Sequence, residues 1–167
     1  MKISIRRFLA FCIDYVLIVL YGSLLFFLTK VFKIESLSTL QAQLVGFFSL
    51  TLPVFLYFFL TETGKHKASL GKRLLKLRVE TPSNYNKTAV FKRNFFKFLP
   101  WEVAHAGVHW MYYFSLQNKE APFWVWVLLI SPQIMALIYI ISILISRGNS
   151  SVYDKIGGTQ LLLNSEK

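Results

Sequence analysis

A long apolar segment near the N-terminus constrains this chain more than any other feature of the sequence. It runs from about Phe8 to Leu28, close to the 20 or so residues that an α-helix needs to cross the hydrocarbon core of a bilayer. Arg6 and Arg7 precede it, and Asp14 lies inside it rather than at its edge. A charged group at such a depth costs about 2.5–3.5 kcal/mol on insertion scales. We therefore expect a membrane-spanning helix whose carboxylate has a specific role.

The composition also indicates a membrane protein. Apolar residues make up 54% of the chain and charged residues 16%, whereas soluble domains have about 25% charged residues. The net charge of +11 would suggest a nucleic-acid partner in a soluble protein. Here the positive-inside rule and anionic lipid headgroups account for it, so the expected partner is the lipid bilayer and no nucleic acid is expected.

Four apolar stretches are expected to form helices within one domain covering residues 1–167. We place them at about 8–28, 42–60, 95–116 and 123–145, with a basic loop at 61–92. The predicted fold is an all-α bundle of four, or alternatively three, transmembrane helices. The third stretch is ambiguous, since it can cross the bilayer, lie in the interface or re-enter; its polar residues are Lys97, Pro100, Glu102, His105 and His109.

The distribution of positive charge favours four crossings. With four, 16 lysines and arginines share the side of both termini and the long loop, and only Lys30, Lys33 and Lys119 lie opposite. This asymmetry predicts a plasma-membrane protein with cytoplasmic N- and C-termini. If the third stretch does not cross, the asymmetry weakens.

A small β-pairing is expected on the cytoplasmic side. Residues 75–79 alternate apolar and basic side chains with period two, which is typical of a half-buried strand, and residues 158–163 also have strand character. We expect the two segments to pair. A turn is expected at residues 81–84, around Pro82.

Asp14 is the first candidate site residue. Because helical side chains lean toward the N-terminus, Arg7 points away from Asp14, and the partner of Asp14 is expected on another helix. The candidates are Arg93, Lys97, His105 and His109. Asp14 then either forms a proton or cation site, or makes a buried polar contact that fixes helix packing.

A second group of candidates lies on the third stretch. Glu102, His105 and His109 fall on one helical arc and predict a polar stripe that faces the bundle. Glu-x-x-His is also a spacing of carboxylate-bridged metal sites, but those sites need the motif on a second helix. No second copy exists in the sequence, so neither a metal nor a cofactor is expected. A satisfied polar cluster, or a partner for Asp14, is the favoured interpretation.

Two glycine-containing motifs lie outside the apolar stretches. Gly71-Lys72-Arg73 is not a phosphate-binding loop, because that loop requires Ser or Thr after the lysine. With no nucleophile–base pair in view either, we expect no enzyme. Near the C-terminus, Gly157 and Gly158 permit a tight turn, and Asp154 is expected to cap it or to pair with Arg73 or Arg78.

Three motifs in this order resemble the RDD family, small bacterial integral membrane proteins named for an arginine and two aspartates. They are an Arg-Arg-Phe-x-Ala-Phe-x-x-Asp opening, a Gly-Lys loop and an Asp-Lys-Ile-x-Gly-Thr segment. The residues that carry the resemblance are Arg6, Arg7 and Asp14 in the first, Gly71 and Lys72 in the second, and Asp154, Gly158 and Thr159 in the third.

The resemblance implies a plasma-membrane protein for which transport, including sodium/proton exchange, has been suggested. Our leading hypothesis is ion or small-solute movement by an oligomer, because four short crossings enclose little space alone. Asp14 would bind or relay the cation, assisted by Glu102, His105 or His109. The alternative is a non-transporting membrane scaffold or accessory protein with a membrane-protein partner.

Overall fold

The computed structural model describes residues 2–32, 37–81 and 86–164. Lys33 and residues 82–84 of the expected turn lie outside the described residues. Most of the described residues are helical. The elements are, in order, α1 Ile3–Val31, α2 Thr39–Gly46, the π-helical segment η1 Phe47–Thr51, α3 Leu52–Thr63, α4 Leu70–Leu74, β1 Leu77–Glu80, α5 Lys87–Leu116, α6 Phe123–Ile145, α7 Val152–Gly157 and β2 Gln160–Leu163.

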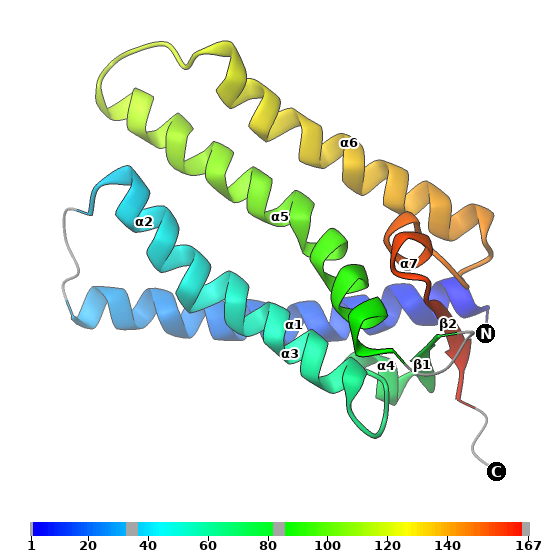
Figure 1. Ribbon diagram of the computed structural model, residues 1–167. Helices are drawn as coiled ribbons and strands as arrows, with labels where there is room; N and C mark the ends of the chain where they lie inside the picture. Colours follow the sequence, from blue (N-terminus) through cyan, green and yellow to red (C-terminus); the bar gives the residue numbers. More distant parts are fainter. Residues whose placement is uncertain (1, 33–36, 82–85, 165–167) are drawn as a thin grey trace.

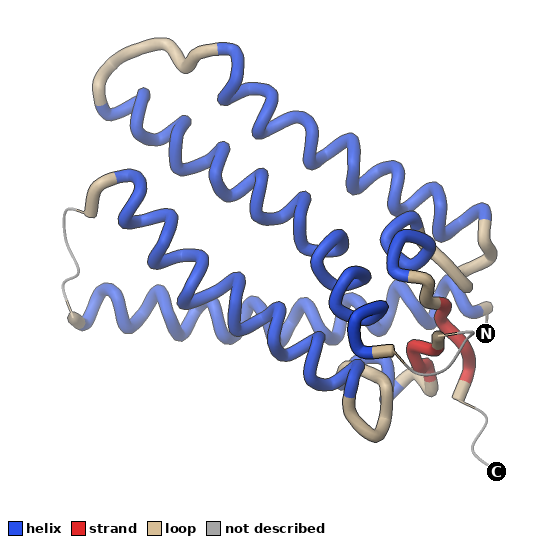
Figure 2. The backbone as a smooth tube through the Cα atoms, in the orientation of Figure 1, coloured by secondary structure: helices blue, strands red, loops and turns tan. Residues whose placement is uncertain are grey.

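Four long helical rods lie alongside one another, with the small elements gathered at one end (Figures 1 and 2). The rods are α1, the continuous α2–η1–α3 stretch, α5 and α6. Both ends of the chain lie near β1, β2 and α7, whereas the α5–α6 connection lies at the opposite end (Figure 1). The all-α fold with a small two-stranded sheet is therefore confirmed.

Three helical stretches are long and apolar enough to cross a membrane: Ile3–Val31, Thr39–Thr63 and Phe123–Ile145. Many of their large apolar side chains are exposed, for example Phe123 at 82% and Ile145 at 80%, which fits helices surrounded by lipid rather than water. α5 is more polar, yet it is a continuous 30-residue helix that packs along α6 (Figure 1). A continuous helix does not re-enter, which removes that alternative for residues 95–116.

The helices extend further at the end that carries the termini than the sequence predicts. α3 ends at Thr63, and α5 begins at Lys87, where the side chain of Asn86 accepts a hydrogen bond of 2.8 Å from the backbone N–H of Thr88. This cap satisfies one of the free N–H groups of the first turn. The predicted loop 61–92 therefore contains two helix ends as well as α4 and β1.

Two prolines inside long helices are compensated by tyrosines from neighbouring helices. Proline has no N–H, so the carbonyl four residues earlier loses its helical partner. For Pro53 that carbonyl is Ser49, which accepts a 2.6 Å hydrogen bond from the Tyr21 hydroxyl. For Pro100 it is Phe96, which accepts one of 2.8 Å from Tyr139. These bonds tie α1 to the α2–α3 stretch and α6 to α5.

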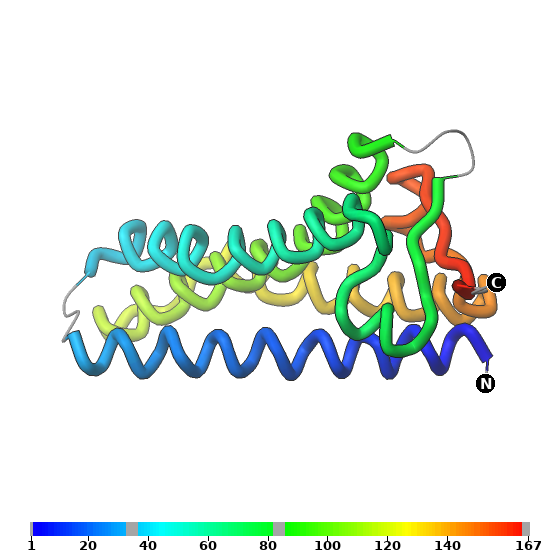
Figure 3. The backbone as a smooth tube through the Cα atoms, turned by 90° about the horizontal axis from the view of Figure 1, so that it is seen from below, coloured from blue at the N-terminus to red at the C-terminus, as the bar shows by residue number. Residues whose placement is uncertain are grey.

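The predicted β-pairing is present. β1 and β2 pair antiparallel, with Leu77 opposite Leu163 and Val79 opposite Leu161. Leu77, Val79 and Leu161 are buried and pack with Ala10 of α1. The sheet thus sits against α1, and Figure 3 shows the segment between α3 and α5 crossing over to that helix.

The Tyr139–Phe96 contact gives a stability prediction. Tyr139→Phe removes the donor and leaves a carbonyl unpaired, so the free energy of unfolding should fall by about 1 kcal/mol. Tyr112→Phe is the control, because that side chain is 64% exposed. Thermal unfolding in detergent measures both, and equal effects would contradict the assigned role.

Candidate functional site

Five buried charged residues meet at the end of the bundle that carries the termini. We call Arg7, Glu62, Lys72, Arg93 and Asp154 the ionic cluster; each of them is at most 8% exposed. They come from α1, α3, α4, α5 and α7 respectively. Since a buried charge is costly unless it is paired, their pairing fixes the positions of five elements.

Asp154 lies at the centre of the ionic cluster, between two arginines. Its Oδ2 is 2.5 Å from Nη2 of Arg7, and its Oδ1 is 2.6 Å from Nε of Arg93. Arg93 also pairs with Glu62, whose other oxygen lies 2.6 Å from Nζ of Lys72. The ring of Tyr153 packs against both arginines, 5.5 Å from each guanidinium carbon.

The carboxylate of Asp154 has two roles. It accepts a 2.8 Å hydrogen bond from the backbone N–H of Ser151 in a capping box at the start of α7, whereas the cap was expected at the Gly157–Gly158 turn. Burial on its own raises the pKa of Asp154, but the charges of Arg93 and Arg7 outweigh burial and hold the pKa below the ordinary value of 3.8. Asp154 is therefore ionised in the folded protein at neutral pH.

A hydrogen-bonded path connects the ionic cluster to Asp14. Lys72 Nζ lies 3.3 Å from Ser69 Oγ, and Ser69 donates a 2.6 Å hydrogen bond to Asp14. Asp14 also accepts hydrogen bonds from the Gly71 N–H at 2.9 Å and the Tyr57 hydroxyl at 3.2 Å. The carboxylate, only 2% exposed, thus holds the loop before α4 against α1.

The prediction of the partners of Asp14 was wrong. Arg93, Lys97, His105 and His109 were the candidates, and none of them forms a hydrogen bond or ion pair with Asp14 in the described part of the chain. The partners come instead from α3 and from the loop that folds back onto α1. Hydroxyl and N–H donors replace the expected cation.

The prediction that Asp154 pairs with Arg73 or Arg78 was also wrong. Arg73 donates to the carbonyl of Ala68, and Arg78 forms an ion pair of 3.2 Å with Glu80. Arg73 and Arg78 each find an acceptor within five residues of their own positions, whereas Asp154 pairs with Arg7 and Arg93 from two distant helices.

Gly71 allows α4 to approach the backbone of α1. A Cβ at this position would lie 2.2 Å from the carbonyl oxygen of Ala10 and 3.1 Å from Cγ of Asp14. The first distance is shorter than a real Cβ contact and the second is tight, so glycine fits here without a shift of the α1 backbone. The Gly-Lys motif therefore has a geometric basis: the glycine permits the approach and Lys72 reaches the ionic cluster.

Glu102, His105 and His109 form a separate polar stripe on α5. The rings of His105 and His109 are 4.9 Å apart between centroids. Glu102 Oε2, His105 Nδ1 and His109 Nε2 are buried atoms without a hydrogen-bond partner among the described residues. The stripe faces α2, since a Cβ on Gly46 would meet the His105 ring at 3.0 Å.

The structure does not bring Asp14 together with this stripe. His105 contacts Gly46, whereas Asp14 bonds Tyr57 on the same helical stretch. Eleven residues separate these two contacts, which is about 16 Å along a helix. In residues 2–32, 37–81 and 86–164, no group of three His, Cys, Asp or Glu side chains is placed to hold a metal ion.

Sequence reasoning missed Glu62, the residue that joins Arg93 to Lys72. The signal was present: Glu62 is an acid at the end of an apolar stretch, next to a strongly basic loop. Arg93 was considered only for Asp14, and Lys72 only as part of a motif. Asn94 adds a 3.0 Å hydrogen bond to Glu62.

The apolar helices and the buried ionic cluster at one end define a multi-pass helical membrane protein. The RDD family model matches residues 4–158 of the chain, and the chain belongs to that family. One residue of each resembling motif, namely Arg7, Lys72 and Asp154, lies in the ionic cluster. No curated protein and no solved structure gives a significant match.

The Gly71 contact gives a second prediction. Gly71→Ala should lower the free energy of unfolding by about 3 kcal/mol or more, because the new methyl group meets backbone that cannot move aside alone. Gly22→Ala is the matched control, since a Cβ there lies 3.9 Å from its nearest neighbour. Thermal unfolding in detergent compares them, and a Gly71 variant as stable as the Gly22 variant would contradict the close approach.

Asp154 gives a prediction on pH. Because its pKa is lower in the folded than in the unfolded state, its ionised form stabilises the fold fully above the ordinary value of 3.8. That stabilisation is lost as the pH falls through the lowered native pKa. Asp154→Asn leaves two arginines short of their partner and should cost about 3–5 kcal/mol at neutral pH.

Unfolding of the native protein and of the Asp154 variant across acidic pH measures this effect. The difference between them should be constant near neutrality and shrink at low pH. Glu120→Gln, on an exposed carboxylate, should show no such trend. A difference that stays constant into strong acid would refute the assignment.

Proposed function

We propose that this protein moves protons or small cations across the plasma membrane, and that the polar stripe of α5 carries the ion. The single observation that carries the proposal is the set of buried, unpartnered atoms on Glu102, His105 and His109. Over seven residues, or about 10 Å of helix, three titratable groups face the bundle without a described partner. Ionisable groups at such depth are functional candidates, and chains of Glu and His serve as proton relays.

The neighbouring helix supports this proposal. Gly46 lies against His105, and the π-helical segment η1 begins at the next residue. π-Helical turns inside longer helices occur frequently at functional sites. The stripe therefore faces the last residue of α2, directly before the irregular backbone of η1.

The proposal requires α5 to cross the bilayer. Its 30 residues correspond to about 45 Å, longer than the hydrocarbon core of about 30 Å. α5 also packs between the α2–α3 stretch and α6, both apolar enough to span. With four crossings, the positive-inside rule gives cytoplasmic termini, and the ionic cluster lies at the cytoplasmic end.

In this proposal Asp14 anchors the cytoplasmic loop and does not carry the ion. Three donors already saturate it, two of them from the loop itself. The pathway is completed by a second copy of the chain, because four crossings enclose little space alone. We infer no enzymatic step.

Flux through reconstituted vesicles tests the proposal. Glu102→Gln should abolish pH-dependent proton or sodium flux, because the amide keeps hydrogen bonding but does not titrate. Glu120→Gln, in the α5–α6 connection, is the matched control and should retain flux. Asp14→Asn should lower thermal stability and keep the flux per folded protein. Flux lost in Asp14→Asn but kept in Glu102→Gln would reverse the two assignments.

A second candidate function is a non-transporting membrane scaffold or accessory protein. The ionic cluster favours it, because every one of its five members is paired and the cluster serves to lock elements together. Absence of flux in vesicles, together with a stoichiometric membrane-protein partner, would establish this alternative over transport.

A further inference from the structure

A groove of about 430 Å³ lies between α1 and α6. Phe8, Phe11 and Tyr15 of α1 form one wall, Ile140 and Leu144 of α6 form the other, and α5 contributes the floor with Lys97 and Trp101. Almost all of these lining side chains are apolar. The charged residues of the lining are Arg7 and Lys97.

The groove is open on the side that faces lipid. The rim residues are exposed in the isolated chain, Phe8 at 64% and Leu144 at 63%. Helices α1 and α6 are both apolar enough to span a membrane, so the opening between them faces the bilayer and not water. An occupant that enters laterally is thus a membrane component.

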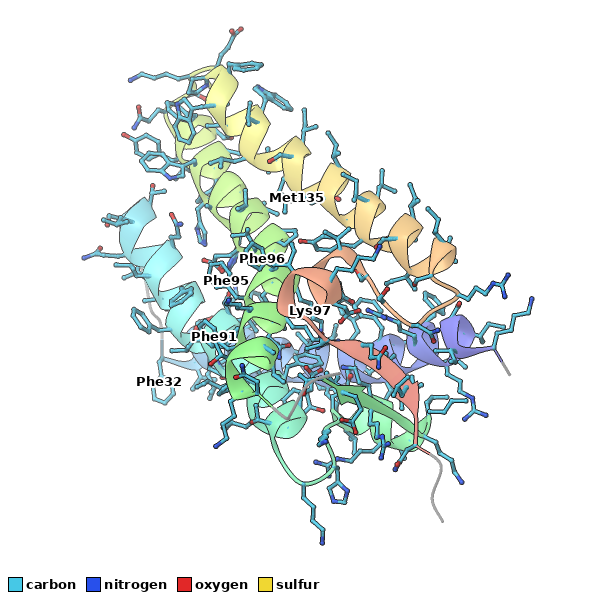
Figure 4. All side chains as sticks on the ribbon, turned by 45° about the vertical axis from the view of Figure 1, so that its right-hand side comes forward. Phe32, Phe91, Phe95, Phe96, Lys97 and Met135 are labelled. Atoms are coloured by element: carbon cyan, nitrogen blue, oxygen red, sulfur yellow. The ribbon has the colours of Figure 1, made fainter. Side chains whose placement is uncertain are left out.

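Lys97 lines the groove and is paired with no carboxylate among the described residues. It forms no hydrogen bond or ion pair with any residue that the structure describes, and its Nζ lies 3.4 Å from the centre of the Phe58 ring. Arg7, Lys72 and Arg93 are buried cations that pair with Asp154 or Glu62. Lys97, which is half-buried, is the basic residue of this region without such a pair. Figure 4 labels it next to Phe95 and Phe96 on α5.

The depth of these groups fits a phospholipid. Arg7 precedes the apolar segment 8–28 by one residue, and Lys97 lies two residues inside the segment 95–116. Both cations are therefore at the level of the headgroups. From Phe8 to Ile18, the groove follows α1 for ten residues, about 15 Å into the apolar layer.

We propose that this groove binds one anionic phospholipid of the cytoplasmic leaflet, with its phosphate at Lys97 and an acyl chain between α1 and α6. A charge-assisted contact of this kind favours an anionic lipid over a zwitterionic one of the same chain length. The proposal uses the bilayer placement argued above but does not depend on transport, since lipid binding is measured without flux.

Native mass spectrometry of the detergent-purified protein, titrated with phosphatidylglycerol or phosphatidylcholine, tests the proposal. The native chain should retain one phosphatidylglycerol roughly tenfold more tightly than phosphatidylcholine. Lys97→Gln should remove this preference, whereas Lys92→Gln, an exposed lysine of the same helix, should keep it. Inorganic phosphate should not compete, because it lacks the acyl chain.

A second variant tests the apolar part separately. Ala136 lines the groove on α6, and Ala136→Phe fills it while leaving both cations in place. This variant should bind neither lipid tightly and should keep the native helical content by circular dichroism. An unchanged preference in Lys97→Gln would overturn the proposal. So would tight lipid binding by the filled variant, or a lipid-free dimer that Ala136→Phe disrupts, since the occupant would then be a second copy.

Discussion

The end of the bundle that carries the termini depends on one carboxylate shared by two arginines. Asp154 lies 2.5 Å from Arg7 and 2.6 Å from Arg93, and all three side chains are buried. Removing such charges from water costs several kcal/mol each, so the arrangement persists only while each charge has its partners. The pairing brings α7 and the following β2 against α1 and α5. Leu161 of β2 then completes the small core with Ala10.

The parts of the fold that follow from local patterns could be predicted from the sequence. The apolar stretches set the helices, and the period-two alternation of residues 75–79 identified a strand that pairs with the C-terminal segment. The sequence indicated a cap by Asp154 but placed it at the Gly157–Gly158 turn, whereas its side chain caps the start of α7 through the N–H of Ser151. The sequence indicates that Pro53 and Pro100 each free a helical carbonyl that needs a hydrogen-bond donor. It does not indicate that the donors are Tyr21 and Tyr139, as the structure shows.

The partners of the buried charges could not be predicted, because they depend on how the loop after α3 folds. That loop returns to α1, where Gly71 allows backbone contact at Ala10 and brings Ser69 to Asp14. The same return places Lys72 beside Glu62. The chain has 19 lysines and arginines but only 8 aspartates and glutamates, so each carboxylate has several possible partners. The close approach at Gly71 determines which of these cations lies beside which carboxylate. This approach has no counterpart in the periodicity of the sequence.

Two polar systems of opposite character therefore occupy α5. Near its start, Arg93 is held by two carboxylates in a closed cluster that fixes the helix to four other elements. Farther along, buried atoms of Glu102, His105 and His109 lack hydrogen-bond partners among the described residues, and His105 lies against Gly46 at the end of α2. A buried group without a partner costs free energy that a purely structural helix would avoid by using apolar residues. In the proposed function, the ionic cluster holds α5 in place while the stripe carries the ion, and the proposed lipid site uses Lys97, which lies between the two.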